Sequence, residues 1–217
     1  MRPIIGFYGF WVYLTYLSLL SAILGMFFAV AGYIAYALIC LMVSGLCDTL
    51  DGKVAGLKQR TDREEGYGIQ LDALADVVAF GALPAVIGFA IAESTGGPPG
   101  VGSIVIFSLY VLAALIRLAY FTVIEVELQG KKEKRKYYEG LPVTIVALII
   151  PVVCSICILL GTPLLPVYNV MLAVLAAAFV AKVKIYKPTG WLKLILCLIG
   201  VPILLLILVA SGVFGGI

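Results

Sequence analysis

Four aspartates lie within or at the edge of strongly apolar segments, an unusual place for a carboxylate. Asp48 and Asp51 occur in the stretch CDTLDGKVAG, and Asp72 and Asp76 occur in GIQLDALADVVAFG. A carboxylate at membrane depth costs about 2.5–3.5 kcal/mol on insertion scales, and four neighbouring carboxylates also repel one another. The nearest basic residues fall toward the polar segment after Asp51, so the cluster predicts a bound cation.

Each pair of aspartates occupies one face of a predicted helix. Positions i, i+3, i+4 and i+7 of the first helix are filled by Asp48, Asp51, Gly52 and Ala55. Positions i, i+4 and i+8 of the second are filled by Gly68, Asp72 and Asp76. A short polar loop joins the two helices, so we expect antiparallel neighbours whose aspartate faces meet. The small residues on these faces permit close approach of a helix or a ligand.

The chain contains no histidine, which removes the commonest general base and the usual transition-metal ligand. Its five cysteines all lie in apolar stretches, where we expect them to be buried as small hydrophobic residues. Carboxylate oxygens without nitrogen or sulfur ligands select hard cations, namely Mg²⁺, Mn²⁺ or Ca²⁺. Four carboxylates could hold two such ions about 3.5–4 Å apart, the spacing of two-metal phosphoryl-transfer sites.

The composition of the whole chain is that of a membrane protein. It has 217 residues, of which 63% are hydrophobic, and a mean hydropathy of +1.16. Because a membrane-spanning helix needs about 20 apolar residues, we expect an all-α polytopic bundle of about seven transmembrane helices, within a range of six to eight, forming a single membrane domain over residues 1–217. The predicted helices cover residues 7–29, 33–52, 68–92, 102–124, 142–160, 164–181 and 190–212.

The basic residues predict the orientation of this bundle. Every lysine and arginine except Arg117 lies near the N-terminus or in the polar segments 53–67, 125–140 and 182–193. Since basic loops stay on the cytosolic side, we expect a protein of the cell membrane whose N-terminus, basic loops and aspartate cluster face the cytosol. Arg117 lies within a predicted helix, where it either has a function or extends to the cytosolic interface.

The stretch from Asp48 to Asp76 resembles the signature of the CDP-alcohol phosphotransferases, D-x-x-D-G-x-x-A-R followed by G-x-x-x-D-x-x-x-D. The chain departs from this signature at Gly56, where the family has arginine, and Lys58 or Arg60 could substitute. QLDALADVVAFGALPA (70–85), IRLAYF around Arg117 and YYEGLPVT (137–144) resemble the phosphatidylserine synthase branch, with Tyr120 in place of a second arginine.

The resemblance implies transfer of a phosphatidyl group from CDP-diacylglycerol, or an ether analogue, to the hydroxyl of L-serine, with release of CMP. It implies that Asp48, Asp51, Asp72 and Asp76 bind divalent cations, Mg²⁺ or Mn²⁺, and that Asp76 is also the general base. The nucleotide-binding residues it implies are Asp51, Gly52, Ala55 and Gly68, and Lys58 or Arg60 is expected to replace the signature arginine. Arg117 is expected to bind the acceptor, because its planar fork fits a carboxylate or a phosphate. The expected partners are these substrates, membrane lipids and a second copy of the chain, and no nucleic acid.

Two other functions remain open. An enzyme of the same family could use glycerol phosphate or inositol phosphate as acceptor, but a phosphorylated acceptor calls for further basic residues near the site, and only Arg117 lies within an apolar segment. A cation transporter could also use intramembrane carboxylates. It would be expected to have internal repeats and a site near the membrane midplane, and the sequence has no convincing repeat.

Overall fold

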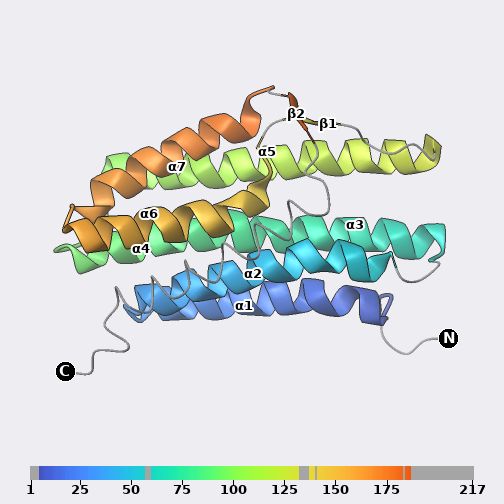
Figure 1. The fold of residues 1–217 in the computed structure, drawn as a ribbon, viewed down its shortest axis with the longest axis horizontal. Helices are drawn as coiled ribbons and strands as arrows, with labels where there is room; N and C mark the ends of the chain where they lie inside the picture. Colours follow the sequence, from blue (N-terminus) through green and yellow to red (C-terminus); the bar gives the residue numbers. More distant parts are fainter. Residues whose placement is uncertain (1–4, 57–59, 132–136, 140, 183, 187–217) are drawn as a thin grey trace.

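Long, roughly aligned helices make up most of the computed structural model, which describes residues 5–56, 60–131, 137–139, 141–182 and 184–186 (Figure 1). In chain order the elements are η1 (Phe10–Val12), α1 (Tyr13–Val30), α2 (Ile34–Ala55), α3 (Asp62–Asp76), η2 (Val77–Ala82), α4 (Leu83–Ser94), α5 (Val101–Lys131), β1 (Tyr137–Glu139), η3 (Val143–Ile145), α6 (Val146–Leu160), α7 (Leu164–Val180) and β2 (Lys184–Tyr186). β1 and β2 form a short antiparallel pair.

The prediction of a polytopic helical membrane protein is confirmed. Five spans in the described part of the chain are long and apolar enough to cross a membrane, and α7 is a shorter apolar helix. The five spans are Phe10–Val30, Ile34–Gly52, Asp62–Ser94, Val101–Glu127 and Val143–Leu160. The predicted helix over 190–212 lies outside the described residues.

Two helices extend by more than one turn beyond the ends that hydropathy predicted. The third predicted helix was placed at 68–92, but α3 already begins at Asp62 because Thr61 and Glu64 form a reciprocal capping box at its start. The fourth was placed at 102–124, whereas α5 continues to Lys131. Hydropathy locates the apolar part of a helix, and both extensions are polar turns beyond it.

α1 and α2 form an antiparallel hairpin that turns at Gly32, where φ is +86°, a value that favours glycine. Hydroxyl groups line the contact between these helices. Ser18 and Ser44 each donate to the other's backbone carbonyl, at 3.2 and 2.7 Å, and Ser21 donates to the carbonyl of Cys40 at 3.0 Å. Such small polar residues hold transmembrane helices close together.

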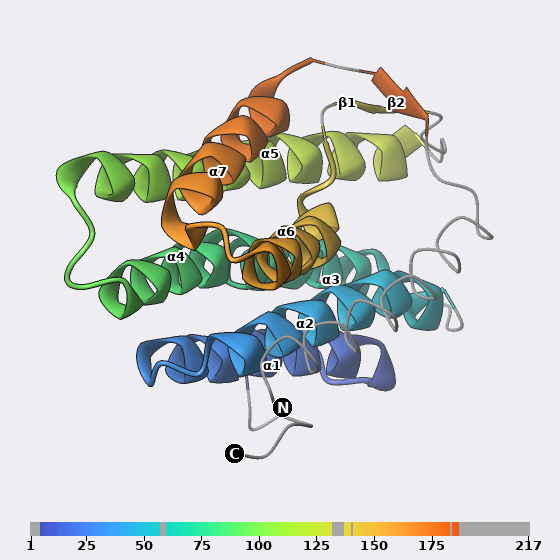
Figure 2. The ribbon, with the colours of Figure 1, turned by 60° about the vertical axis from the view of Figure 1, so that its left-hand side comes forward.

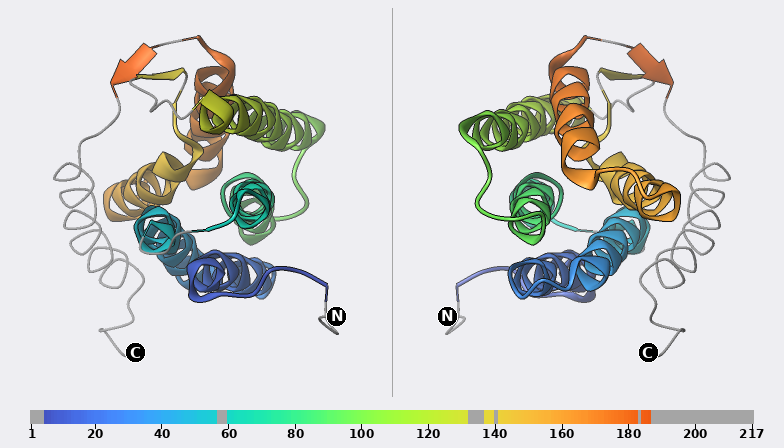
Figure 3. Two further views of the ribbon diagram at one scale, coloured as in Figure 1. Left: turned by 90° about the vertical axis from the view of Figure 1, so that its right-hand side faces the viewer. Right: turned by 90° about the vertical axis from the view of Figure 1, so that its left-hand side faces the viewer.

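α3, η2 and α4 form one continuous helical span, Asp62–Ser94, and more of it is buried than of any other span. Viewed end-on, it lies between the α1–α2 hairpin and α5 (Figure 3). η2 is a π-helical segment in which the N–H of Leu83 bonds to the carbonyl of Val78, five residues earlier. π-helical turns are rare and often lie at functional sites, and this one begins directly after Asp76.

The remaining helices complete the core around this central span. α5 packs against α7, while α6 contacts α2 and α7 (Figure 2). Two fully buried tyrosines tie this half of the bundle to the central span: Tyr110 of α5 donates to the carbonyl of Phe80, and Tyr168 of α7 donates to that of Pro84, both at 2.7 Å. The central span is thereby held by neighbours on both sides.

Candidate metal and phosphoryl-transfer site

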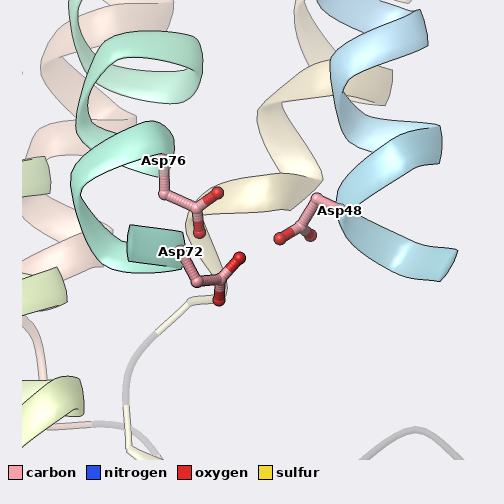
Figure 4. A group of neighbouring side chains, drawn as sticks. All are labelled: Asp48, Asp72 and Asp76. Carbon is pink, nitrogen blue, oxygen red and sulfur yellow. The ribbon is translucent and has the colours of Figure 1, made fainter. Parts of the chain in front are cut away.

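Three of the four aspartates converge from two helices, as their spacing predicted. Asp48 projects from α2 toward Asp72 and Asp76 of α3, and the three carboxylates point toward one another (Figure 4). One oxygen from each lies within 4.8 Å of the others. Asp76 is buried, whereas Asp48 and Asp72 are half-buried. The cluster is therefore closed off at Asp76 and accessible at Asp48 and Asp72.

Asp51 lies beside this triad and links it to α1. It is within side-chain hydrogen-bonding reach of Asp72, just as Asp48 is of Asp76. On its other side, Oδ2 of Asp51 accepts a 3.1 Å hydrogen bond from the hydroxyl of Thr15. All four aspartates therefore form one connected cluster.

The residues of this cluster fit a divalent metal ion. The donor atoms are carboxylate oxygens alone, which suit hard cations such as Mg²⁺, Mn²⁺ and Ca²⁺. Oδ1 of Asp72 is buried and has no hydrogen-bond partner among the described residues. A buried polar oxygen without a partner calls for an explanation, and an ion is one. Two carboxyls can share a hydrogen bond only through a proton, and a cation can take the place of that proton.

Gly52, next to Asp51, differs from the glycines that serve packing. A Cβ built on Gly45 would collide with the Cβ of Ala147, whereas a Cβ on Gly52 would meet no atom within 4 Å. Packing between helices therefore does not require glycine at position 52. Open space beside the cluster leaves room for a ligand to approach the backbone of α2, and Ala55 lies one turn further along the same face.

Arg60 lies against the other glycine of the predicted site. A Cβ on Gly68 would stand 3.3 Å from Nη1 of Arg60, so the guanidinium covers α3 one turn before Asp72. Its Nε is buried and has no hydrogen-bond partner among the described residues. The structure thus brings one of the two candidate replacements for the signature arginine close to the cluster. The other, Lys58, lies outside the described residues.

Arg117 is buried, with 7% of its surface exposed, and its guanidinium lies 5.6 Å from the centre of the Phe121 ring. α5 runs antiparallel to the central span, with Tyr110 bonded to Phe80. Arg117 comes seven residues after Tyr110, about 10 Å further along α5. It therefore lies level with the turn of α3 that contains Asp76. Arg117 therefore does not extend to the surface of the protein.

Two features of the site were not predicted from the sequence. Thr15 lies on a different helix, 36 residues before its partner Asp51, and a single threonine in an apolar stretch gives no signal of that contact. The π-helical segment after Asp76 does have a signal in the sequence. This signal is Pro84, which has no N–H to donate to the carbonyl four residues before it.

Several curated proteins are similar to this chain. It is 43% identical over 110 residues to the CDP-diacylglycerol–serine O-phosphatidyltransferase of Saccharomyces cerevisiae, a match covering 49% of this chain and 37% of that protein. It is 32% identical over 121 residues to the enzyme of the same name from Helicobacter pylori, covering 56% and 48%. It is 31% identical over 137 residues to the archaetidylserine synthase of Methanothermobacter thermautotrophicus, covering 63% and 54%. The matches thus span about half of each relative or less.

The family model of the CDP-alcohol phosphatidyltransferases matches residues 12–181. This segment runs from the start of the membrane bundle to the end of α7 and includes all four aspartates, Thr15 and Arg117. The match covers well over half of the chain and contains the whole carboxylate cluster. The chain belongs to the CDP-alcohol phosphatidyltransferase family.

Proposed function

We propose that this chain transfers a phosphatidyl group, or its ether-lipid counterpart, from a CDP-linked lipid to the hydroxyl of L-serine and releases CMP. The observation that carries the proposal is the convergence of Asp48, Asp72 and Asp76 within 4.8 Å, inside a bundle of apolar helices. The names of the similar proteins, which include serine phosphatidyltransferases and an archaetidylserine synthase, support serine as the acceptor.

In the proposed reaction the serine oxygen attacks the phosphorus that carries the lipid. A bond forms between that oxygen and phosphorus, and the bond from phosphorus to the oxygen of CMP breaks, so that CMP leaves with the electron pair. Asp76 accepts the hydroxyl proton as the attack proceeds. A carboxylate can act as such a base when it is held within hydrogen-bond reach of the hydroxyl, and Asp76 is buried at the inner side of the cluster.

The proposed cofactor is a divalent cation, Mg²⁺ or Mn²⁺ with Ca²⁺ as a further candidate, bound as two ions. Asp48, Asp51, Asp72 and Asp76 would hold it. When bound, such ions neutralise the pyrophosphate and stabilise the charge that develops during phosphoryl transfer. The oxygen-only donor set and the buried Oδ1 of Asp72 support this assignment.

We assign the nucleotide to the face formed by Gly52, Ala55 and Gly68. The open space over Gly52 admits the ligand to the backbone beside Asp51. Arg60, whose guanidinium lies over Gly68, would pair with a phosphate oxygen and so replace the arginine that the signature has at Gly56. An arginine suits this role because its planar fork donates two parallel hydrogen bonds to a phosphate. Lys58 remains the second candidate.

Arg117 is the proposed acceptor-binding residue. Its position level with Asp76 would bring its donors near a serine whose hydroxyl faces that base. A bidentate pair with the serine carboxylate would hold the acceptor in place. Among the described residues, the five spans contain two basic residues, Arg117 and Arg63, and Arg63 lies at the start of its span. This scarcity of basic residues favours serine over a phosphorylated acceptor.

We place the protein in the cell membrane, with the N-terminus, the basic segments and the aspartate cluster on the cytosolic side. The concentration of lysine and arginine in segments 53–67, 125–140 and 182–193 supports this orientation. We also propose a homodimer, as the family resemblance implies.

An acceptor panel with the purified protein tests the proposal. With CDP-diacylglycerol and Mn²⁺, serine should yield phosphatidylserine, while glycerol phosphate and inositol phosphate should yield no product. Asp76→Asn should lower kcat by about 10²–10⁴-fold and retain CDP-lipid binding better than Asp48→Asn or Asp72→Asn. Equal loss of binding in all three variants would show that Asp76 acts mainly as a metal ligand. Product from a phosphorylated acceptor alone would exclude serine.

A further inference from the structure

We propose that Thr15 of α1 is a positioning residue for Asp51, fixing the orientation of this carboxylate beside Asp72 at the metal site. The inference rests on the proposed function in one respect, namely the role of Asp51 as a ligand. The hydroxyl of Thr15 donates to Oδ2 of Asp51 at 3.1 Å. Thr15 is 6% exposed and Asp51 is 8% exposed, so water does not compete freely for this bond.

The choice of partner distinguishes Thr15 from other hydroxyl groups in these helices. Thr49, Ser108 and Thr122 each donate to the carbonyl four residues earlier in their own helix, at 2.8 Å. This is the usual way to satisfy a hydroxyl within an apolar helix. Thr15 instead donates to a carboxylate on the neighbouring helix. A hydrogen bond to a charged acceptor is stronger than one to a backbone carbonyl, so it restrains the Asp51 side chain more effectively.

The contact between α1 and α2 sets this geometry. Ser18 and Ser44 exchange hydrogen bonds one turn along α1 from Thr15, and further along a Cβ on Gly25 would stand only 2.9 Å from that of Cys40. The two helices of the hairpin are therefore closely packed along their contact. This packing fixes the axial position of Thr15 beside Asp51. The line of hydroxyl contacts ends at the carboxylate cluster.

The bond constrains how Asp51 can bind a cation. Because Oδ2 is engaged by Thr15, this bond sets the orientation of the Asp51 carboxylate beside Asp72. Hydrogen bonds that orient a metal ligand are typically worth about 10–100-fold in metal affinity or activity. Thr15 thus acts on the site without touching substrate or metal.

The test compares Mn²⁺ binding to Thr15→Val, Thr15→Ser and Ser18→Ala in purified protein without substrate, measured by electron paramagnetic resonance. Valine keeps the shape of threonine but removes the hydroxyl, so the Mn²⁺ dissociation constant should rise at least about tenfold. Serine restores the donor and should bring binding back close to that of the unchanged protein. Ser18→Ala removes a buried hydroxyl from the same helix contact but no donor to a carboxylate, and should leave Mn²⁺ binding unchanged.

Activity measurements separate this inference from the proposed function. Thr15→Val should shift the Mn²⁺ concentration needed for half-maximal CMP release, with the KM for serine unchanged. If Thr15→Val binds Mn²⁺ as the unchanged protein does, or if Ser18→Ala weakens binding equally, Thr15 only supports helix packing and the inference is wrong. If the unchanged protein neither binds Mn²⁺ nor releases CMP, the proposed function fails, and the inference with it.

Discussion

The hydroxyl of Tyr110 donates a 2.7 Å hydrogen bond to the backbone carbonyl of Phe80, four residues beyond Asp76. In an α-helix this carbonyl would accept from the residue four positions later, which here is Pro84 and has no N–H. Tyr110 supplies a side-chain donor to this carbonyl from a neighbouring helix. The helix that carries Asp72 and Asp76 thus continues through a π-helical segment in which the Phe80 carbonyl keeps a donor, as an apolar surrounding requires.

Tyr110→Phe should destabilise the protein by about 1–3 kcal/mol, the cost of removing this donor from a buried carbonyl. Tyr168→Phe is the matched control, because Tyr168 is equally buried and also donates at 2.7 Å, to the carbonyl of Pro84. That carbonyl lies within α4, where Gly88 has an N–H to offer, so the loss should be smaller. Unfolding of both variants in detergent measures the difference. Equal loss would show that the proline has no special effect.

Much of the site could be predicted from the sequence because it depends on local spacing. Two aspartates at i and i+3, and two at i and i+4, necessarily share a helix face, and the short polar segment between the two pairs predicts that their helices are neighbours. The start of α3 was also readable, since Thr61 and Glu64 have capping-box spacing, but the polar run around them was interpreted as a loop.

The rest of the site depends on contacts between distant segments. The partnership of Thr15 with Asp51 follows from how α1 packs on α2, and nothing in either segment specifies it. The hydrogen bond from Tyr110 to Phe80 depends on the relative position of α5 and η2 along their helix axes. The π-helical segment itself inserts one residue into the regular 3.6-residue period, which a search for that period cannot detect.

Gly52→Ala should fold normally and lose transferase activity. The added methyl group would meet no protein atom within 4 Å, and alanine in a helix is favoured over glycine by roughly 0.5–1 kcal/mol. The methyl group would instead occupy the space assigned to the nucleotide, so KM for the CDP-lipid should rise. Gly66→Ala is the control, because its Cβ would also meet nothing and position 66 has no proposed contact with substrate. Full activity of Gly52→Ala would place the nucleotide elsewhere.

Arg60→Gln should weaken binding of CMP and of the CDP-lipid while leaving the KM for serine unchanged. A hydrogen bond to a charged group contributes about 1.5–3 kcal/mol, which corresponds to a loss of about tenfold or more in affinity. Arg63→Gln removes the same charge from an exposed position on the first turn of α3 and is the matched control. Titration of each variant with CMP gives the comparison. Similar affinities in the two variants would argue for Lys58 as the phosphate-binding residue.

Arg117→Lys should raise the KM for serine more than the KM for the CDP-lipid. Lysine keeps the positive charge but not the planar fork that pairs with a carboxylate. An acceptor without a carboxylate, such as ethanolamine, should be insensitive to the change if it reacts at all. Steady-state kinetics with both substrates varied separates the two effects. If only the KM for the lipid rises, Arg117 belongs to the phosphate site.

The most direct test of the whole account is CMP release from CDP-diacylglycerol by the purified protein, measured with and without serine, in Mn²⁺ and in EDTA. CMP and phosphatidylserine should appear in equal amounts when serine and Mn²⁺ are both present. EDTA should abolish turnover, and Asp48→Asn, Asp51→Asn or Asp72→Asn should each reduce it by at least about 10²–10³-fold. Full turnover in EDTA, or full activity after loss of Asp48 or Asp72, would contradict the assignment of a metal-dependent phosphatidyl transfer to this carboxylate cluster.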